Sequence, residues 1–126
     1  MSFFKNLFKT DPEVDFQMGL RAETFEGNYE KAAWFYKKAA QNGHAAGQFY
    51  FGLMLLHGRG VRQDFSEAVN FVQASANQNY YKAQYLMAQM YYKGIGVENN
   101  PTEGDKWMEK FSHHNQDSSK LSFLDL

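Results

Sequence analysis

The sequence predicts an all-α fold, a solenoid of about three two-helix repeats of 36 residues each. Three observations support it. The sequence matches itself when shifted by 36 positions, helix-capping residues recur at that spacing, and so do glycine or asparagine residues suited to ending a helix. Periods of about 20 to 50 residues are typical of arrays in which each unit buries its apolar face against its neighbours.

The start of the second helix in each repeat carries a capping residue. Asn28, Asp64 and Asn100 stand 36 residues apart. Each side chain can accept a hydrogen bond from a backbone N–H in the first turn of a helix. Pro101 follows the third of them, at a position where proline is favoured.

Helix ends and turns recur with the same period. Gly43, Asn79 and Asn115 are 36 residues apart, and both residue types tolerate the left-handed conformation that ends a helix. The Gly-x-Gly-Val turn at 58–61 returns at 94–97. We therefore expect six helices, near residues 12–25, 28–42, 45–57, 64–78, 81–93 and 101–113.

The 126 residues are interpreted as a single repeat domain, because a chain of this length supports one core. Its expected parts are an N-terminal cap segment at 1–11, a short first repeat at 12–43, a second repeat at 44–79, a third repeat at 80–115, and a C-terminal cap or tail at 116–126.

The turn and small-residue pattern resembles the Sel-one-like repeat (SLR) family, a relative of the tetratricopeptide repeat. The matching residues are GHAAGQFYFG at 43–52, HGRGVRQD at 57–64 and YYKGIGV at 91–97. The resemblance covers roughly residues 12–115. It implies a right-handed superhelix whose first helices line a concave surface, and a role as an adaptor, scaffold or inhibitor that binds a partner protein.

Composition narrows the function classes. The chain has no cysteine, which excludes disulfides and thiolate metal sites and agrees with a reducing compartment. A formal net charge of -1 gives no sign of nucleic-acid binding. The sequence has no apolar run of the roughly 20 residues that a membrane-spanning helix needs, and its start does not resemble a secretory signal. The expected location is cytoplasmic, without a membrane partner.

The predicted binding surface is a concave wall formed by the first helices. The segment 45–57 is apolar nearly all round, whereas a surface helix normally has one polar face. Exposed aromatic and leucine side chains are typical of protein-binding surfaces. The candidate partner-binding residues are Phe16, Leu20, Glu23, Phe49, Leu53, Leu56, His57, Tyr85, Gln89, Tyr92 and Lys93. The alternative is that the terminal segments fold back and bury this wall.

Both ends of the sequence are apolar. The residues concerned are Phe3, Phe4, Leu7 and Phe8 at one end, and Leu121, Phe123, Leu124 and Leu126 at the other. Such segments can anchor a protein to a membrane surface or bind a partner. They can also cap the exposed ends of a solenoid, which is the interpretation preferred here.

No residue pattern indicates an enzyme, a metal site or a cofactor. His44 and His57 lie at opposite ends of one expected helix, and the neighbouring His113 and His114 point in different directions. The sequence therefore favours a protein-binding module, either an adaptor or a dedicated inhibitor or immunity protein. The alternative is a small hydrolase of the penicillin-binding type found in cysteine-rich relatives, which the absence of cysteine disfavours.

Overall fold

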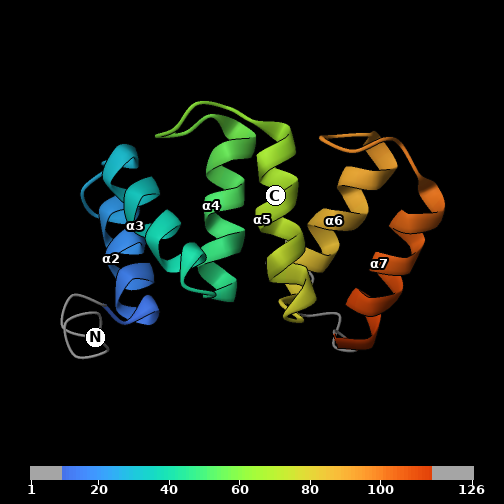
Figure 1. Cartoon of the computed structure of the whole chain (residues 1–126), viewed down its shortest axis with the longest axis horizontal. Coiled ribbons are helices and arrows are strands. Elements are labelled where there is room, and N and C mark those ends of the chain that lie inside the picture. The colour runs from blue at the N-terminus through green and yellow to red at the C-terminus, as the bar shows by residue number, and fades with distance from the viewer. Residues whose placement is uncertain (1–9, 115–126) are drawn as a thin grey trace, which may run out of the picture.

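The computed structural model describes residues 10–114. This part of the chain folds into six α-helices: α2 (Pro12–Thr24), α3 (Tyr29–Gln41), α4 (Ala45–His57), α5 (Phe65–Asn77), α6 (Tyr81–Lys93) and α7 (Pro101–His114). Every helix begins and ends within one residue of its predicted range, and the predicted fold class is confirmed (Figure 1). The predicted cap segments fall almost wholly outside the described residues.

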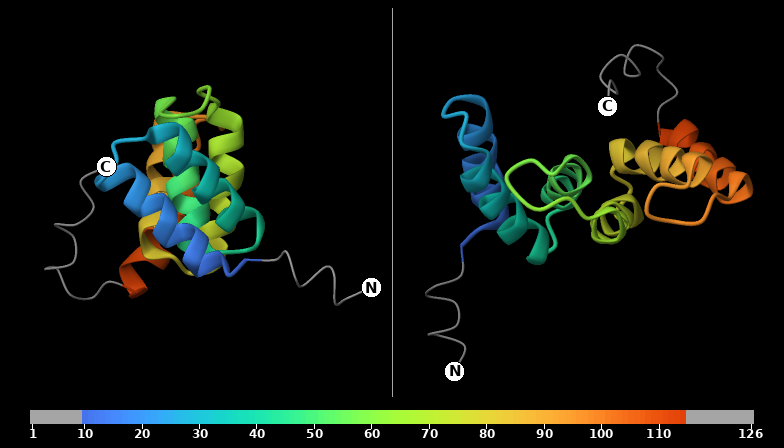
Figure 2. Two further views of the ribbon diagram at one scale, coloured as in Figure 1. Left: turned by 90° about the vertical axis from the view of Figure 1, so that its left-hand side faces the viewer. Right: turned by 90° about the horizontal axis from the view of Figure 1, so that it is seen from above.

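The helices form three antiparallel pairs arranged along the long axis of the molecule (Figures 1 and 2). Each helix packs against the next one in the chain, and α2 also contacts α4. Seen from above, α4 and α6 lie on one side of the array while α3 and α5 lie on the other (Figure 2, right). The first helices of successive repeats therefore share one face.

The three predicted N-caps are confirmed. The side-chain oxygens of Asn28, Asp64 and Asn100 each accept a hydrogen bond from the backbone N–H three residues later, at 3.0, 3.0 and 3.2 Å. These bonds satisfy N–H groups that have no partner within the helix, which is why the helices begin where they do.

Alanine at either of the caps Asp64 and Asn100 is expected to lower the free energy of unfolding by about 0.5–2 kcal/mol. Urea unfolding followed by circular dichroism measures the change. The matched control is Ser66→Ala, an exposed position in the first turn of α5 that should change stability by less than about 0.5 kcal/mol. Neutral substitutions at both caps would contradict the assignment of these residues.

The predicted helix stops are confirmed where the structure describes them. Gly43 has φ 84° and Asn79 has φ 64°, both in the left-handed region. Asn115 lies outside the described residues.

The two Gly-x-Gly turns rest on the preceding repeat. Gly60 and Gly96 have φ 74° and 71°. A Cβ at Gly60 would overlap the carbonyl oxygen of Tyr29, the first residue of α3, and a Cβ at Gly96 would overlap that of Phe65, the first residue of α5. Each turn thus contacts the start of the second helix in the repeat before it, where only glycine fits.

Two buried glutamines occupy the same repeat position but bond differently. The Gln48 amide donates to the Ala40 carbonyl at 3.3 Å and accepts from the Gln78 side chain at 2.9 Å. The side chain of Gln84, 0% exposed, has no hydrogen-bond partner among residues 10–114. Gln78, which bonds to Gln48, corresponds to His114 one repeat later. The His114 side chain forms no such hydrogen bond to Gln84.

This difference predicts opposite effects of leucine at the two positions. Gln48→Leu should cost about 1 kcal/mol, because it removes the hydrogen bonds to the Ala40 carbonyl and from the Gln78 amide, which keeps its bond to the Gly43 carbonyl at 2.9 Å. Gln84→Leu should be neutral or stabilising by up to about 1 kcal/mol, because it removes a buried amide that forms no bond with the described residues 10–114. Thermal unfolding of the two variants, compared side by side, checks the prediction. Equal destabilisation would contradict it.

Candidate functional site

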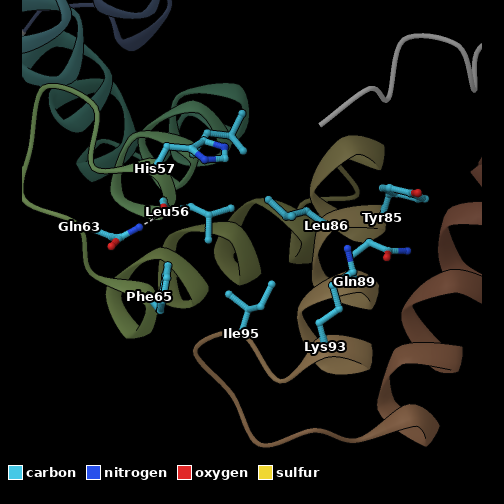
Figure 3. A pocket seen from close by; sticks show the side chains of 10 residues that line it. Leu56, His57, Gln63, Phe65, Tyr85, Leu86, Gln89, Lys93 and Ile95 are labelled. Atoms are coloured by element: carbon cyan, nitrogen blue, oxygen red, sulfur yellow. Dashed lines mark hydrogen bonds between the residues drawn. The ribbon is translucent and has the colours of Figure 1, made fainter.

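The structure brings six of the eleven predicted wall residues together around one groove. They are Leu53, Leu56 and His57 of α4 and Tyr85, Gln89 and Lys93 of α6 (Figure 3). The remaining lining residues are Gln63, Phe65, Leu86 and Ile95, and the volume is about 500 Å³. We call this hollow the α4–α6 groove. It lies between the second and third repeats.

The groove is apolar with a few polar side chains. Its floor and walls are formed mainly by leucine, isoleucine and aromatic side chains, and His57, Gln89 and Lys93 add polar groups (Figure 3). Gln63 is already used within the turn, since its amide donates to the Leu56 carbonyl at 2.9 Å. The lining contains no carboxylate, and neither α4 nor α6 contains an aspartate or glutamate. The charge available to a ligand is therefore positive.

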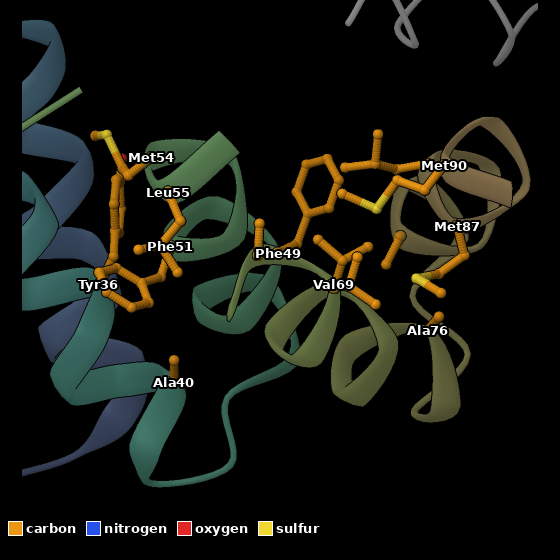
Figure 4. Packing of buried hydrophobic residues seen from close by; sticks show 14 of the residues in the cluster. Tyr36, Ala40, Phe49, Phe51, Met54, Leu55, Val69, Ala76, Met87 and Met90 are labelled. Atoms are coloured by element: carbon orange, nitrogen blue, oxygen red, sulfur yellow. The ribbon is translucent and has the colours of Figure 1, made fainter. Parts of the chain in front are cut away.

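The predicted exposure of Phe16 and Phe49 is wrong. They are 8% and 1% exposed, and Phe49 is one of the buried core residues in Figure 4. The Phe16 ring stacks on His44 at 4.8 Å between centroids, and the Phe49 ring contacts Tyr80 at 5.4 Å. His44 and Tyr80 are the residues just before α4 and α6. The wall aromatic of one repeat therefore packs against the start of the next.

Tyr92 was also predicted to lie on the free wall, but it packs within its own repeat. Its hydroxyl donates to the Asp105 carboxylate at 2.6 Å. A Cβ at Gly104 would lie 2.5 Å from the Tyr92 ring, so the ring covers that glycine of α7. Tyr92 does not line the groove.

The two remaining predicted residues belong to the first repeat and lie apart from the groove. Glu23 accepts a hydrogen bond from the Tyr36 hydroxyl at 2.5 Å. Leu20 lines a separate, open hollow of about 820 Å³ along α2, which ends at Phe25, a residue 87% exposed. The predicted wall residues thus fall into four groups: the groove, contacts between repeats (Phe16 and Phe49), contacts within a repeat (Glu23 and Tyr92), and the open hollow along α2 (Leu20).

His44 has a structural role that the sequence did not reveal. Its Nδ1 accepts a hydrogen bond from the backbone N–H of Gly47 at 2.9 Å, which caps α4. The ring proton therefore sits on Nε2, which donates to the Glu13 carboxylate at 2.6 Å. Hydrogen bonds from Gln17 and His44 lower the pKa of Glu13. Nδ1 of His44 thus caps α4 within the second repeat, and Nε2 joins that repeat to the first.

Periodicity along single helices missed four lining residues of the groove, Gln63, Phe65, Leu86 and Ile95. Gln63 and Ile95 belong to turns, and Phe65 is the first residue of α5. The sequence signal that could have found Ile95 is the repeated turn at 94–97, which crosses to the preceding repeat.

Within residues 10–114, no group of three or more histidine, aspartate or glutamate residues is placed to hold a metal ion. None of the helices described is both long and apolar enough to cross a membrane.

The fold is shared with solved repeat structures. A Sel1 repeat protein from Oxalobacter formigenes is 34% identical with a TM-score of 0.79, over 82% of this chain and 31% of that one. A protective antigen of uropathogenic Escherichia coli with an SLR fold is 30% identical with a TM-score of 0.80, over 82% of this chain and 23% of the other. Helicobacter pylori cysteine rich protein B, 19% identical, shares the fold with a TM-score of 0.69, over 90% of this chain and 95% of that one.

Two curated proteins are similar over most of this chain but are much longer. An uncharacterized protein of Neisseria meningitidis serogroup B is 25% identical over 99 residues, which are 79% of this chain and 20% of that protein. Chitin synthase regulatory factor 3 of Schizosaccharomyces pombe is 29% identical over 87 residues, which are 68% of this chain and 9% of that protein. The Sel1 repeat model itself matches residues 16–44, 45–80 and 82–115. These three matches cover most of the sequence, and the chain belongs to the Sel1 repeat family.

Proposed function

We propose that this protein is a binding module, and not an enzyme, that holds a segment of a partner protein in the α4–α6 groove. The observation that carries the proposal is the groove itself. It is open and mostly apolar, and Leu53, Leu56 and Tyr85 are only partly buried in it. Sel1 repeat scaffolds are generally protein-interaction modules, which supports the same conclusion.

The shape of the groove suits a helix or loop laid across two repeats. Neighbouring repeats offer a continuous surface that a partner segment can follow. The lining has two aromatic side chains, Tyr85 and Phe65, and the anchor proposed here is Tyr85 on the first helix of its repeat. Aromatic residues that lose water on binding contribute most to such interfaces. Lys93 at the same site favours a partner segment that carries carboxylates, and the His57 ring adds a group that can form hydrogen bonds.

Within residues 10–114, the groups with altered pKa lie outside the groove, which supports a role without catalysis. Burial raises the pKa of Tyr36 and of Tyr80. The hydrogen bond to Asp105 raises the pKa of Tyr92. Altered titration inside a cleft is a common sign of an active site. These shifts come instead from core packing and from contacts between or within repeats.

The proposal covers two subtypes, an adaptor and a dedicated inhibitor or immunity protein. They differ in whether the partner's own activity falls when it binds. The cytoplasm is the proposed location, on the basis of the cysteine-free sequence. No observation favours the hydrolase alternative. The cysteine-rich Helicobacter protein is only 19% identical, and a similarity at that level supports a shared fold but not a shared activity.

Tyr85→Ala is expected to weaken binding of a partner captured with the wild-type protein by about thirtyfold, the loss of one aromatic anchor. Asn70→Ala, on the exposed surface of α5, is the matched control and should bind as the wild type does. Titration calorimetry with the purified partner measures both. A partner that binds Tyr85→Ala normally and loses affinity for Asn70→Ala would place the interface on the other side.

A further inference from the structure

The α4–α6 groove begins beside the end of α7. Tyr85 lines the groove, and its ring contacts Phe111 of α7 at 5.3 Å between centroids. The helix ends three residues later, at His114. The described chain therefore ends close to the groove, with residues 115–126 still to follow. At about 3.3 Å per residue they can extend to roughly 40 Å, enough to follow the groove along its length.

The outer face of α7 offers a poorer site for those residues. In α5, Val69 is 5% exposed and faces the turn of the third repeat at Gly96. The residue 36 positions later is Asp105, which is exposed. Ala76, 1% exposed, is likewise replaced by the exposed Ser112. The surface that receives a following repeat in α5 has thus become polar in α7.

The composition of residues 115–126 matches the groove. They include four large apolar residues and two aspartates: Leu121, Phe123, Leu124, Leu126, Asp117 and Asp125. The groove supplies apolar lining with Lys93 and His57 and has no carboxylate. The helix α7 carries both signs of charge, with Glu103, Asp105 and Glu109 beside Lys106 and Lys110. The apolar side chains of the segment favour the apolar groove, and its aspartates meet no carboxylate there, whereas α7 has three.

We propose that residues 115–126 dock in the α4–α6 groove of their own chain, with leucine and phenylalanine side chains against Leu53, Leu56 and Tyr85. A tethered segment has an effective concentration near the millimolar range, so weak intrinsic affinity suffices. The docked segment covers the surface that a partner needs, and a partner must displace it. Only this last consequence rests on the proposed function.

Disulfide trapping in the full-length protein tests the docking. The natural chain contains no cysteine, so an introduced pair reports proximity without background. The test pair is Gln89→Cys with Ser122→Cys. The controls combine Ser122→Cys with Asn70→Cys on α5 or with Asp105→Cys on the outer face of α7. Mild oxidation, followed by non-reducing electrophoresis and peptide mapping, gives the rate of each intramolecular bond.

The Gln89 pair should form its bond about tenfold faster than the Asn70 pair, because docking raises the local concentration at the groove. Adding Leu121→Ser, Phe123→Ser and Leu124→Ser should reduce the Gln89 rate to the control level. A fastest bond at Asp105 would show that the segment caps α7, and dimers linked between chains would show that a second copy fills the groove. Equal rates at all three positions would mean that the segment does not dock. Any of these last three results, a fastest bond at Asp105, dimers linked between chains or equal rates, overturns the proposal.

A second readout separates this inference from the proposed function. The oxidised Gln89 pair, with the segment locked in place, should bind the captured partner about tenfold more weakly than its reduced form. If the Gln89 pair forms its bond slowly while Tyr85→Ala still weakens partner binding by about thirtyfold, the docking is rejected and the groove remains the proposed partner site. Fast trapping with full partner affinity would confirm the docking and place the partner elsewhere.

Discussion

Gly60→Ala is expected to lower the free energy of unfolding by about 3 kcal/mol or more, the combined cost of a left-handed alanine and an overpacked contact. Gly60 has φ 74°, and an added Cβ would overlap the carbonyl group of Tyr29. That group is backbone at the start of α3, so it cannot move aside as a flexible side chain would. For a domain of this size the melting temperature should fall by about 12 °C.

Gly27→Ala is the matched control. Gly27 has a similar φ of 61°, but a Cβ there would meet nothing within 4 Å. Only the backbone conformation is penalised, at about 1–2 kcal/mol. Thermal unfolding by circular dichroism compares the two variants. Equal losses would mean that the turn at 58–61 does not press on the preceding repeat.

Phe49→Ala is expected to destabilise the protein by about 3–5 kcal/mol, the usual cost of emptying a buried aromatic site. Phe49 is 1% exposed and packs against Tyr80 at the start of the third repeat. Tyr85 occupies the same position one repeat later, yet it is only partly buried. Tyr85→Ala should therefore cost about 1 kcal/mol, as is typical of a partly exposed site.

The comparison of Phe49 and Tyr85 distinguishes a structural position from a binding position. Urea unfolding of both alanine variants gives the two free energies under the same conditions. If Tyr85→Ala proved as destabilising as Phe49→Ala, Tyr85 would be a core residue and its effect on partner binding would have a different meaning.

The helices were predictable from the sequence because their signals are local. Asn28, Asp64 and Asn100 cap helices by bonding to residues three positions away, and Gly43 and Asn79 end helices through their own φ angles. None of these depends on how the repeats stack. The 36-residue period then arranges the pairs in order, because each can bury its apolar face only against a neighbour.

The groove was only partly predictable because it depends on contacts between repeats. Helical periodicity places Phe49 and Tyr85 on the same face, but Phe49 is covered by Tyr80 of the next repeat. Tyr92 was misplaced for a similar reason, since its ring covers Gly104, a residue without a side chain. Burial at these two positions depends on the neighbouring helix or turn, so it cannot be predicted from the residue pattern of a single helix.

The glutamines at one repeat position also show that contacts between helices cannot be predicted from the repeat pattern alone. Gln48 and Gln84 are identical in type and spacing, and both are buried. In the part of the chain that the structure describes, only Gln48 finds a partner, because Gln78 reaches it from the end of α5. The environment of a repeat position therefore changes where the array approaches its last described helix.

Site-specific photo-crosslinking tests most directly whether the α4–α6 groove is the partner site. A benzophenone amino acid is placed at Gln89 in the groove or at Asn70 on α5, and the full-length protein is irradiated with its captured partner. We expect covalent capture from Gln89 and none from Asn70. Capture from Asn70 with none from Gln89 would contradict the assignment of the groove.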